Sequence, residues 1–202
     1  MSPIVTSLTA FVLAGGKSSR MGRDKAFLPW GEGTLLSHAL QVASAVSPRV
    51  RIVGSATKFV PFGPVVEDIY RDRGPLGGIH AALAGCSTDL NLMLAVDLPL
   101  IEPRFLEFLI ALAEKSGAVV TVPYADGVSQ PLCAVYRREF AAIAEQSLQA
   151  GRNKIDPLFA TVRTRIVPAE EWTHAGFSAA MFRNLNTHEE WKAAQPEPCP
   201  PT

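Results

Sequence analysis

A short, almost continuous apolar run over residues 8–13 ends directly at a pair of glycines, Gly15 and Gly16. Apolar residues without alternation indicate a strand that is buried on both faces, as in a parallel sheet covered by helices. A second uninterrupted apolar run, residues 92–96, leads in the same way into Asp97. These two runs constrain the fold most strongly, because a sheet buried on both faces requires helices on either side.

Helix and strand patterns alternate along the rest of the chain. The pattern predicts helices over residues 34–46, 75–84, 103–115 and 138–149, and strands over residues 50–53, 65–66, 118–122 and 132–136. Such a βαβα order favours a Rossmann-like α/β fold in three layers, with an open, mainly parallel sheet and right-handed crossovers. In this architecture ligands bind at the carboxyl ends of the strands.

The length of the chain sets the expected number of domains. With 202 residues it can bury one sizeable core and is short for two independent ones. We therefore expect a single domain over residues 1–195. Residues 196–202 are rich in proline, and we expect a disordered tail there.

Charge and cysteine content narrow the class of partner and the compartment. The 19 basic residues balance 19 acidic ones, so no net field favours binding to nucleic acid or to an anionic membrane. Neither a secretory signal nor an apolar stretch of membrane-spanning length is evident. Three cysteines form no CxxC pair and no even disulfide framework, which fits a reducing compartment and argues against zinc. We expect a cytoplasmic protein that acts on small molecules.

The glycine-rich segment over residues 13–25 is the strongest functional signal. Adjacent glycines let the backbone approach a nucleotide and turn N–H groups toward phosphate oxygens, while Arg20 and Lys25 add cationic donors. The segment is not a Walker A loop, which would require glycine where Phe11 stands. It is not the dinucleotide motif GxGxxG either, because the next glycine after Gly16 is Gly22.

This segment, LAGG-x-S-x-RMG-x-DK, resembles the motif of nucleotidyltransferases that modify molybdopterin. Its double glycine is similar to the molybdenum cofactor guanylyltransferase family, whereas the cytidylyltransferase branch usually carries alanine at the position of Gly15. The resemblance implies a fold of the nucleotide-diphospho-sugar transferase type. It also implies transfer of GMP from GTP to the terminal phosphate of molybdopterin, with release of pyrophosphate. GTP and molybdopterin would be the substrates, with other molybdenum cofactor biosynthesis or acceptor proteins as further partners.

The resemblance, together with the position of the segment, assigns roles around the first strand. Nucleotide contacts fall on the residues that end this strand and begin the loop, and catalytic roles fall on Arg20, Lys25 and Asp97. The nucleotide-binding set is Leu13, Ala14, Gly15, Gly16, Lys25, Asp68 and Asp97.

Asp97 is the predicted ligand for Mg²⁺. It follows a buried strand, so its carboxylate would lie at the carboxyl edge of the sheet, and a lone carboxylate there can hold this ion together with substrate phosphates and waters. The alternative is a cap for the following helix, which is disfavoured because Pro99 intervenes and Glu102 lies nearer the helix start.

Glu67 and Asp68 end the third predicted strand. The resemblance matches Asp68 to a residue that contacts the nucleotide, and a carboxylate accepts hydrogen bonds from guanine, whose N1–H and amino group are donors. The sequence leaves open which of the two carboxylates does this, and a solvated loop acid is the alternative for each.

The C-terminal segment around Asn184 and Asn186 resembles a family segment that lies near the pterin substrate. Amides could offer donors and acceptors to a pterin ring. A turn and helix cap is an equally good interpretation. Two positions depart from the family pattern, since Gly54 stands where asparagine is frequent and His188 replaces a proline.

Three rival functions remain at this stage. A molybdopterin cytidylyltransferase would differ only in the base it accepts, and a sugar-1-phosphate nucleotidyltransferase would share the fold and a similar loop. A catalytically silent nucleotide-binding module is the third, and the presence of Lys25 together with Asp97 argues against it.

Overall fold

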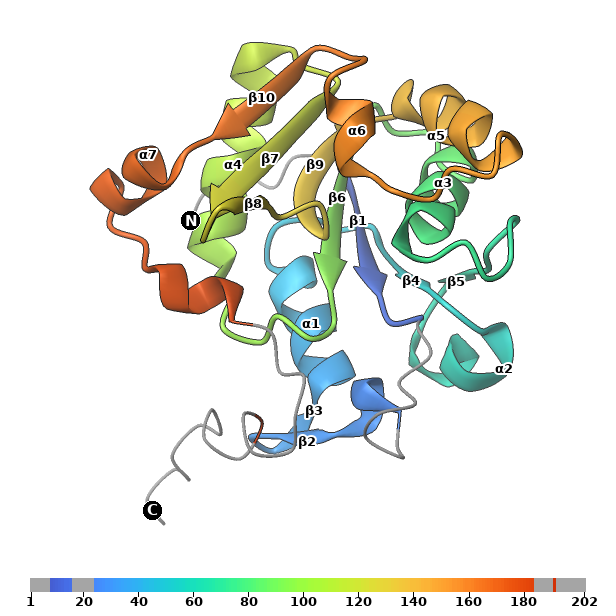
Figure 1. Ribbon diagram of the computed structural model, residues 1–202. Helices are drawn as coiled ribbons and strands as arrows, with labels where there is room; N and C mark the ends of the chain where they lie inside the picture. Colours follow the sequence, from blue (N-terminus) through green and yellow to red (C-terminus); the bar gives the residue numbers. More distant parts are fainter. Residues whose placement is uncertain (1–7, 16–23, 184–190, 192–202) are drawn as a thin grey trace.

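The computed structural model describes residues 8–15, 24–183 and 191. Figure 1 shows a twisted sheet with helices packed against it. In chain order the elements are β1 (Leu8–Leu13), η1 (Lys25–Phe27), β2 (Pro29–Trp30), β3 (Gly33–Thr34), α1 (Leu35–Ser44), β4 (Val50–Val53), α2 (Ala56–Phe59), η2 (Val60–Phe62), β5 (Val65–Val66), α3 (Pro75–Ala84), β6 (Leu90–Ala95), α4 (Pro103–Ser116), β7 (Val120–Ala125), β8 (Val128–Ser129), β9 (Cys133–Arg137), α5 (Phe140–Gln149), α6 (Asp156–Phe159), β10 (Thr164–Val167), α7 (Ala169–His174) and η3 (Ala179–Phe182).

The main sheet has the strand order β10-β7-β9-β6-β1-β4-β5, and β8 pairs with β7. Strand β1 runs parallel to β6 along one edge and to β4 along the other. Strand β9 is antiparallel to both of its neighbours, β6 and β7. The connection between β7 and β9 is too short for a crossover helix, so the chain turns back through β8. The predicted α/β fold with a mainly parallel sheet is confirmed, with β9 reversed.

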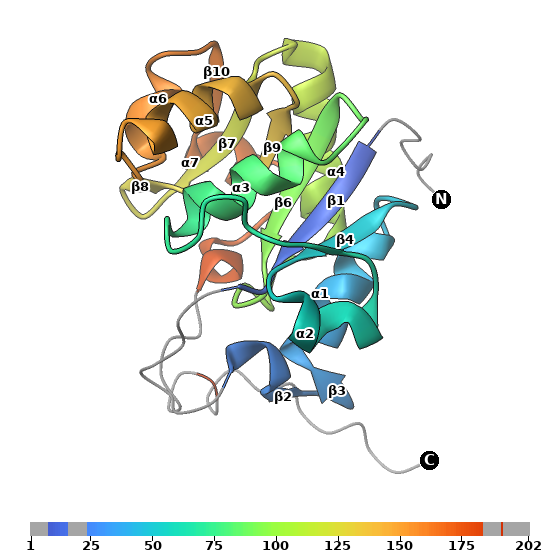
Figure 2. The ribbon, with the colours of Figure 1, turned by 90° about the vertical axis from the view of Figure 1, so that its right-hand side faces the viewer.

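Helices cover both faces of the sheet, which produces the predicted three layers. In β1, Leu8, Ala10 and Val12 belong to a buried cluster on one face, and Phe11 and Leu13 belong to a second cluster on the other. Helices α1 and α4 contribute to the first cluster, and α3 and α5 to the second, as Figure 2 shows from the side. Strand β1 is therefore buried on both faces, as its uninterrupted apolar run predicts.

The helix boundaries follow local signals that the sequence carries. Thr34 caps α1, because its side chain accepts a hydrogen bond from the backbone N–H of Ser37, and the Ser37 hydroxyl completes a capping box. Helix α3 begins with Pro75 in its first turn, where the missing N–H costs nothing. Helix α4 ends at Gly117, which adopts the left-handed conformation with φ 59°.

The hairpin β2–β3, the single turn α2 and the edge strand β10 are not among the predicted elements. Length alone does not explain this, because β4 has four residues like β10 and β5 has only two, and both are predicted. Several predicted boundaries shift by up to three residues. The strand predicted over residues 92–96 spans Leu90–Ala95, the strand predicted over 118–122 spans Val120–Ala125, and the helix predicted from residue 138 begins at Phe140.

The parallel strands β1 and β6 point toward the end of the molecule where the hairpin β2–β3 lies (Figure 1). Their carboxyl ends therefore form one edge, where ligands bind in sheets of this kind. Among the described residues, none of the helices has both the length and the apolar character needed to span a bilayer.

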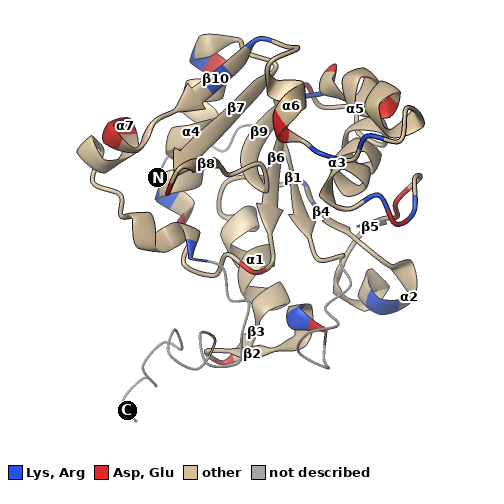
Figure 3. Ribbon diagram, viewed as in Figure 1, with Lys and Arg blue, Asp and Glu red and all other residues tan. Residues whose placement is uncertain are grey.

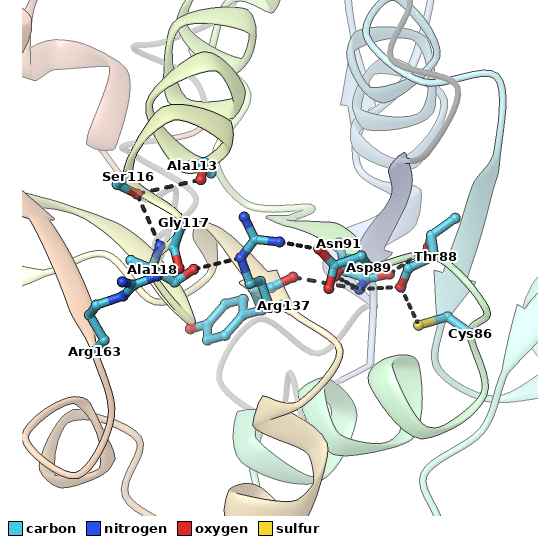
Figure 4. Close-up of polar contacts among 11 residues, drawn as sticks. Cys86, Thr88, Asp89, Asn91, Ala113, Ser116, Gly117, Ala118, Arg137 and Arg163 are labelled. Carbon is cyan, nitrogen blue, oxygen red and sulfur yellow. Dashed lines mark hydrogen bonds and ion pairs between the residues drawn. The ribbon is translucent and has the colours of Figure 1, made fainter.

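A buried polar network holds the opposite, amino edge of the sheet (Figure 4). The Thr88 hydroxyl lies 2.8 Å from the hydroxyl of Thr9. It also lies 2.9 Å from Oδ1 of Asn91, and Figure 4 shows Thr88 beside Asn91. The amide of Asn91 donates to the carbonyls of Thr88 (3.1 Å) and Asp89 (3.0 Å). Asn91 is fully buried, so its removal would leave several polar groups without partners.

We expect Asn91→Ala to lower the free energy of unfolding by about 1–3 kcal/mol, the cost of buried polar groups that lose their partners. For a chain of this size that corresponds to a fall in Tm of about 3–10 °C, measurable by circular dichroism. Nucleotide binding should not change, because the network lies at the far edge of the sheet. The exposed Asn153→Ala is the matched control, and an equal Tm for both variants would contradict the role of the network.

Candidate active site

Backbone hydrogen bonds lock the end of β1 to both of its parallel neighbours. The N–H of Val96 donates to the carbonyl of Leu13 (3.1 Å), which fixes the loop that follows β6. The N–H groups of Ala14 and Gly15 both donate to the carbonyl of Val53 at the end of β4 (3.0 Å each). These two N–H groups are therefore occupied. The N–H of Gly15 is thus engaged within the sheet, and the nucleotide contacts assigned to Ala14 and Gly15 stay predictions.

Lys25 and Asp97 meet at this edge, although 72 residues separate them in the sequence. Nζ of Lys25 lies 3.3 Å from Oδ2 of Asp97, and their side chains are 18% and 26% exposed. Lys25 begins η1, whereas Asp97 lies in the turn after β6. Strands β1 and β6 carry no charged residue, so the charged groups at this edge come from the turns that follow the strands. Figure 3 shows that most charged residues of the described chain lie on helices and loops.

The loop that carries Asp97 is held by a residue that the sequence analysis does not single out. Nε2 of His38, in α1, donates to the carbonyl of Pro99 at 2.8 Å. Asp97 does not cap α4, whose N-cap is Glu102, so the alternative interpretation of Asp97 is wrong. A backbone carbonyl 61 residues away leaves no pattern in the sequence, and for this reason His38 could not be found there.

The structure distinguishes the two carboxylates that follow β5. Oε1 of Glu67 accepts a hydrogen bond from the N–H of Ala56 (2.9 Å) and thereby caps α2. The carboxylate of Asp68 lies against the first turn of α3, where a Cβ added to Gly77 or Gly78 would come within 3.7 and 3.6 Å of it. Asp68 is half-buried at the carboxyl edge, whereas Glu67 serves the local backbone.

Burial raises the pKa of Asp68 above its usual value of 3.8, and the nearby charge of Asp72 raises it further. The folded protein therefore holds this carboxylate at a cost when it is ionised. Carboxylates whose pKa is raised by burial are frequent at functional sites. The fold stabilises their charge poorly, and a bound ligand can stabilise it instead.

Gly15 and Gly54 bring the ends of β1 and β4 into close contact. A Cβ on Gly54 would lie 2.7 Å from the ring of Phe59, so this position has no space for the asparagine that is frequent in the family. A Cβ on Gly15 would lie 3.4 Å from Cα of Gly54, which is ordinary contact. The ring of Phe59 thus fills the space beside β4, and an alanine at position 15 can be accommodated.

Several predicted site residues lie outside the described residues, namely Gly16, Arg20, Asn184 and Asn186. The predicted residues Leu13, Ala14, Gly15, Lys25, Asp68 and Asp97 are described. Leu13, Ala14 and Gly15 lie at the carboxyl end of β1, Asp68 and Asp97 follow β5 and β6, and Lys25 begins η1. Strands β6 and β5 stand three positions apart in the sheet, a span of about 14 Å at about 4.8 Å per strand, which suits an extended nucleotide.

Asp97 is the predicted ligand for Mg²⁺ at this edge, and its side chain is 26% exposed. In the part of the chain that the structure describes, no group of three or more His, Cys, Asp or Glu could hold a metal ion. A single carboxylate is compatible with Mg²⁺, which uses one or two carboxylates and completes its shell with waters and phosphates.

The open, mainly parallel sheet and the lysine and aspartate at its carboxyl edge define an α/β protein of the nucleotide-diphospho-sugar transferase type. The model of the MobA-like NTP transferase domain matches residues 10–167. A molybdenum cofactor guanylyltransferase of Syntrophotalea carbinolica is 33% identical over 91% of this chain and 89% of its own length. The chain belongs to the MobA-like NTP transferase family, among the molybdenum cofactor guanylyltransferases.

Other relatives and solved structures agree with this placement. A probable molybdenum cofactor guanylyltransferase of Pelotomaculum thermopropionicum is 34% identical over 89% of this chain and 87% of its own. The crystal structure of molybdopterin-guanine dinucleotide biosynthesis protein A from Archaeoglobus fulgidus superposes with a TM-score of 0.80 and 26% identity, and the match covers 93% of this chain and 96% of that one.

We expect Asp68→Asn to raise Tm at pH 7, because the variant removes a charge that burial destabilises. The raised pKa means that the penalty is absent below pH 3.8 and complete above the folded-state pKa. The difference in Tm between variant and wild type should therefore shrink as the pH falls toward 3.8. Thermal denaturation across this range measures it, with the exposed Glu114→Gln as control. A lower Tm for Asp68→Asn at pH 7 would contradict the argument.

Proposed function

We propose that this protein transfers GMP from GTP to the terminal phosphate of molybdopterin, forming molybdopterin guanine dinucleotide and releasing pyrophosphate. The observation that carries the proposal is the pair of Lys25 and Asp97, 3.3 Å apart at the shared carboxyl edge of β1 and β6. Family membership and the printed names of the relatives support the substrates. GTP and molybdopterin are then the partners, and other molybdenum cofactor proteins would supply the acceptor or receive the product.

In the proposed reaction an oxygen of the acceptor phosphate forms a bond to the α-phosphorus of GTP. The bond from this phosphorus to the bridging oxygen of the β-phosphate breaks, and pyrophosphate leaves with the electron pair. A phosphate nucleophile is already ionised at neutral pH, so the step needs no general base. Lys25 and Arg20 are assigned to the phosphates, where their charge would offset the charge that develops on the leaving group.

Asp97 is the residue assigned to Mg²⁺. One of its carboxylate oxygens faces Lys25, and a carboxylate has a second oxygen to offer to a cation. When bound, the ion would neutralise phosphate charge and orient the triphosphate. Lys25 would then share its attraction between Asp97 and the phosphates.

The guanine and the pterin are assigned to opposite parts of the chain. Asp68 is the carboxylate that we assign to guanine, because it is half-buried beside Gly77 and Gly78, whereas Glu67 is engaged in capping α2. Asn184 and Asn186 are assigned to the pterin on the resemblance alone. Residues 1–195 would work as one domain with residues 196–202 as a tail, and the unpaired cysteines favour the cytoplasm.

The first test of this function is titration calorimetry with GTP, CTP and ATP, each with and without Mg²⁺. Selective binding of GTP that Mg²⁺ strengthens would support the proposal. A preference for CTP would indicate a cytidylyltransferase, and failure to bind any nucleotide would refute the assignment of the glycine-rich segment.

We expect Lys25→Ala and Asp97→Ala each to lower kcat/KM for GTP by about 100-fold or more, the usual loss when an electrostatic contact at the reacting phosphate is removed. Steady-state assays with molybdopterin and GTP measure this effect, and Tm checks the fold. The exposed Lys154→Ala is the matched control. Full turnover in either site variant would remove that residue from the mechanism.

We expect Gly15→Ala to weaken the use of GTP more than the use of CTP, because the added methyl group reduces the room for a purine. The variant should fold, since among the described residues the new Cβ would meet Cα of Gly54 at 3.4 Å and the carbonyl of Val53 at 3.6 Å, both ordinary contacts. Competition between the two nucleotides measures the change. An unaltered ratio would show that position 15 does not select the base.

A further inference from the structure

Asp24, the residue before Lys25, joins two segments of the chain with its two carboxylate oxygens. Oδ1 accepts a hydrogen bond from the N–H of Ala26 (3.2 Å), so Asp24 is the N-cap of η1. Oδ2 accepts from Nζ of Lys58 (2.9 Å), which lies in α2. One side chain therefore closes the turn that carries Lys25 and ties this turn to α2.

Phe27, two residues after Lys25, is tied to the same region. The ring of Phe27 stacks on Phe59 in α2, with centroids 5.7 Å apart, and contacts Phe62 in η2 at 5.6 Å. Phe59 is almost fully buried, and its ring fills the space beside Gly54 at the end of β4. The turn η1 is thus held on both flanks by residues 58–62, of which Phe59 is buried in the core.

These two attachments fix the position of the backbone of Lys25, from which its side chain extends. Ala26 is fully buried, and Leu28 N–H donates to the carbonyl of Lys25 at 3.0 Å, so the backbone of the turn is fixed on the side of the sheet. From that position Nζ of Lys25 reaches Oδ2 of Asp97. Holding a long lysine side chain in one orientation costs conformational entropy. When the backbone of the residue is already fixed, less entropy is lost on bringing the ammonium group to the phosphates.

The pair of Asp24 and Lys58 contributes little to stability, which points to a different role. The side chain of Lys58 is 54% exposed and that of Asp24 is 20% exposed. Exposed ion pairs of this type are weak, because water and salt screen them. Loss of the ammonium group should leave the fold in place and change mainly the geometry of η1.

We propose that Asp24 and Lys58 form a positioning pair that holds Lys25 in the orientation required for phosphate transfer. The proposal rests on the proposed function, in which Lys25 acts on the phosphates of GTP. Neither Asp24 nor Lys58 touches the reacting atoms in this scheme. Their effect is exerted through Lys25 and falls mainly on the transfer step, because most of the contacts assigned to GTP come from other residues.

The test uses three substitutions in the full chain. Asp24→Asn keeps an oxygen that can cap η1 and removes the charge, Lys58→Met keeps the length and removes the ammonium, and Lys58→Arg keeps the charge. Lys154→Met changes an exposed lysine elsewhere and is the matched control. We expect Asp24→Asn and Lys58→Met to lower kcat by about 10- to 100-fold, as misplaced catalytic groups do.

Three features separate positioning from a merely structural role. KM for GTP and Tm should stay near the wild-type values, the double variant should be no slower than the slower single variant, and Lys58→Arg should restore most of the turnover that Lys58→Met loses. Full kcat in Lys58→Met would overturn the proposal. A loss of kcat that follows a loss of Tm, without restoration by arginine, would overturn it too.

A second measurement separates this proposal from the proposed function. Acetylation of Lys25 by acetic anhydride in the free protein, followed by peptide mass spectrometry, should be several times faster in Asp24→Asn and Lys58→Met than in wild type. Wild-type rates in both variants would overturn the positioning role. If the wild-type chain transfers no GMP, the proposed function fails, and the labelling rates alone decide whether the pair holds Lys25.

Discussion

Strand β1 is hydrogen-bonded to a parallel neighbour along each edge and buried on both faces, so its position is set from four sides. The five apolar residues of the strand each pack into one of the two cores, and the strand cannot shift register without moving their side chains to the wrong face. The end of this strand is consequently the most firmly fixed point of the carboxyl edge. The bonds from Val96 to Leu13 and from Gly15 to Val53 transmit that position to the strands beside it.

The charged residues at this edge lie around the end of β1 but do not belong to the strands of the sheet. Lys25 comes from the turn η1 and Asp97 from the loop after β6, and both depend on contacts from the helical layer. His38 of α1 holds the loop of Asp97, while α2 and η2 hold η1. Asp68 is ionised at the expense of stability beside α3. A rigid sheet therefore supplies the frame, and the surrounding helices adjust the charged groups.

The fold could be predicted from the sequence wherever burial leaves a long, regular pattern. The runs over residues 8–13 and 92–96 identify central strands because both faces of such strands must be apolar, and Thr34 identifies a helix start because its side chain replaces a missing backbone partner. Strands β2 and β3, with the sequences Pro-Trp and Gly-Thr, contain no apolar run, and a threonine and an arginine make up half of β10. The reversal of β9 depends on the length of one connection, which matters only once its neighbours are known.

The candidate site could be predicted in part for a related reason. Asp97 and Lys25 could be placed at one edge because parallel strands end together. The contacts of Lys58 with Asp24 and of Glu67 with Ala56 could not be predicted from the sequence. Each contact joins two surface segments that come close together only in the folded chain. The structure places Lys25, Asp68 and Asp97 at the carboxyl edge, and the roles of all the predicted site residues, including Arg20, Asn184 and Asn186, stay predictions.

The placement of β9 between β6 and β7 has a consequence for the order in which a growing chain can fold. Both β6 and β7 leave the ribosome before β9, yet they do not pair with each other, and each keeps an open edge until residues 133–137 arrive. Because β6 is apolar on both faces, such an edge invites pairing with another chain. A nascent or truncated chain that ends before β9 should thus be the form most prone to aggregate, and insertion of one reversed strand covers the exposed edge of β6.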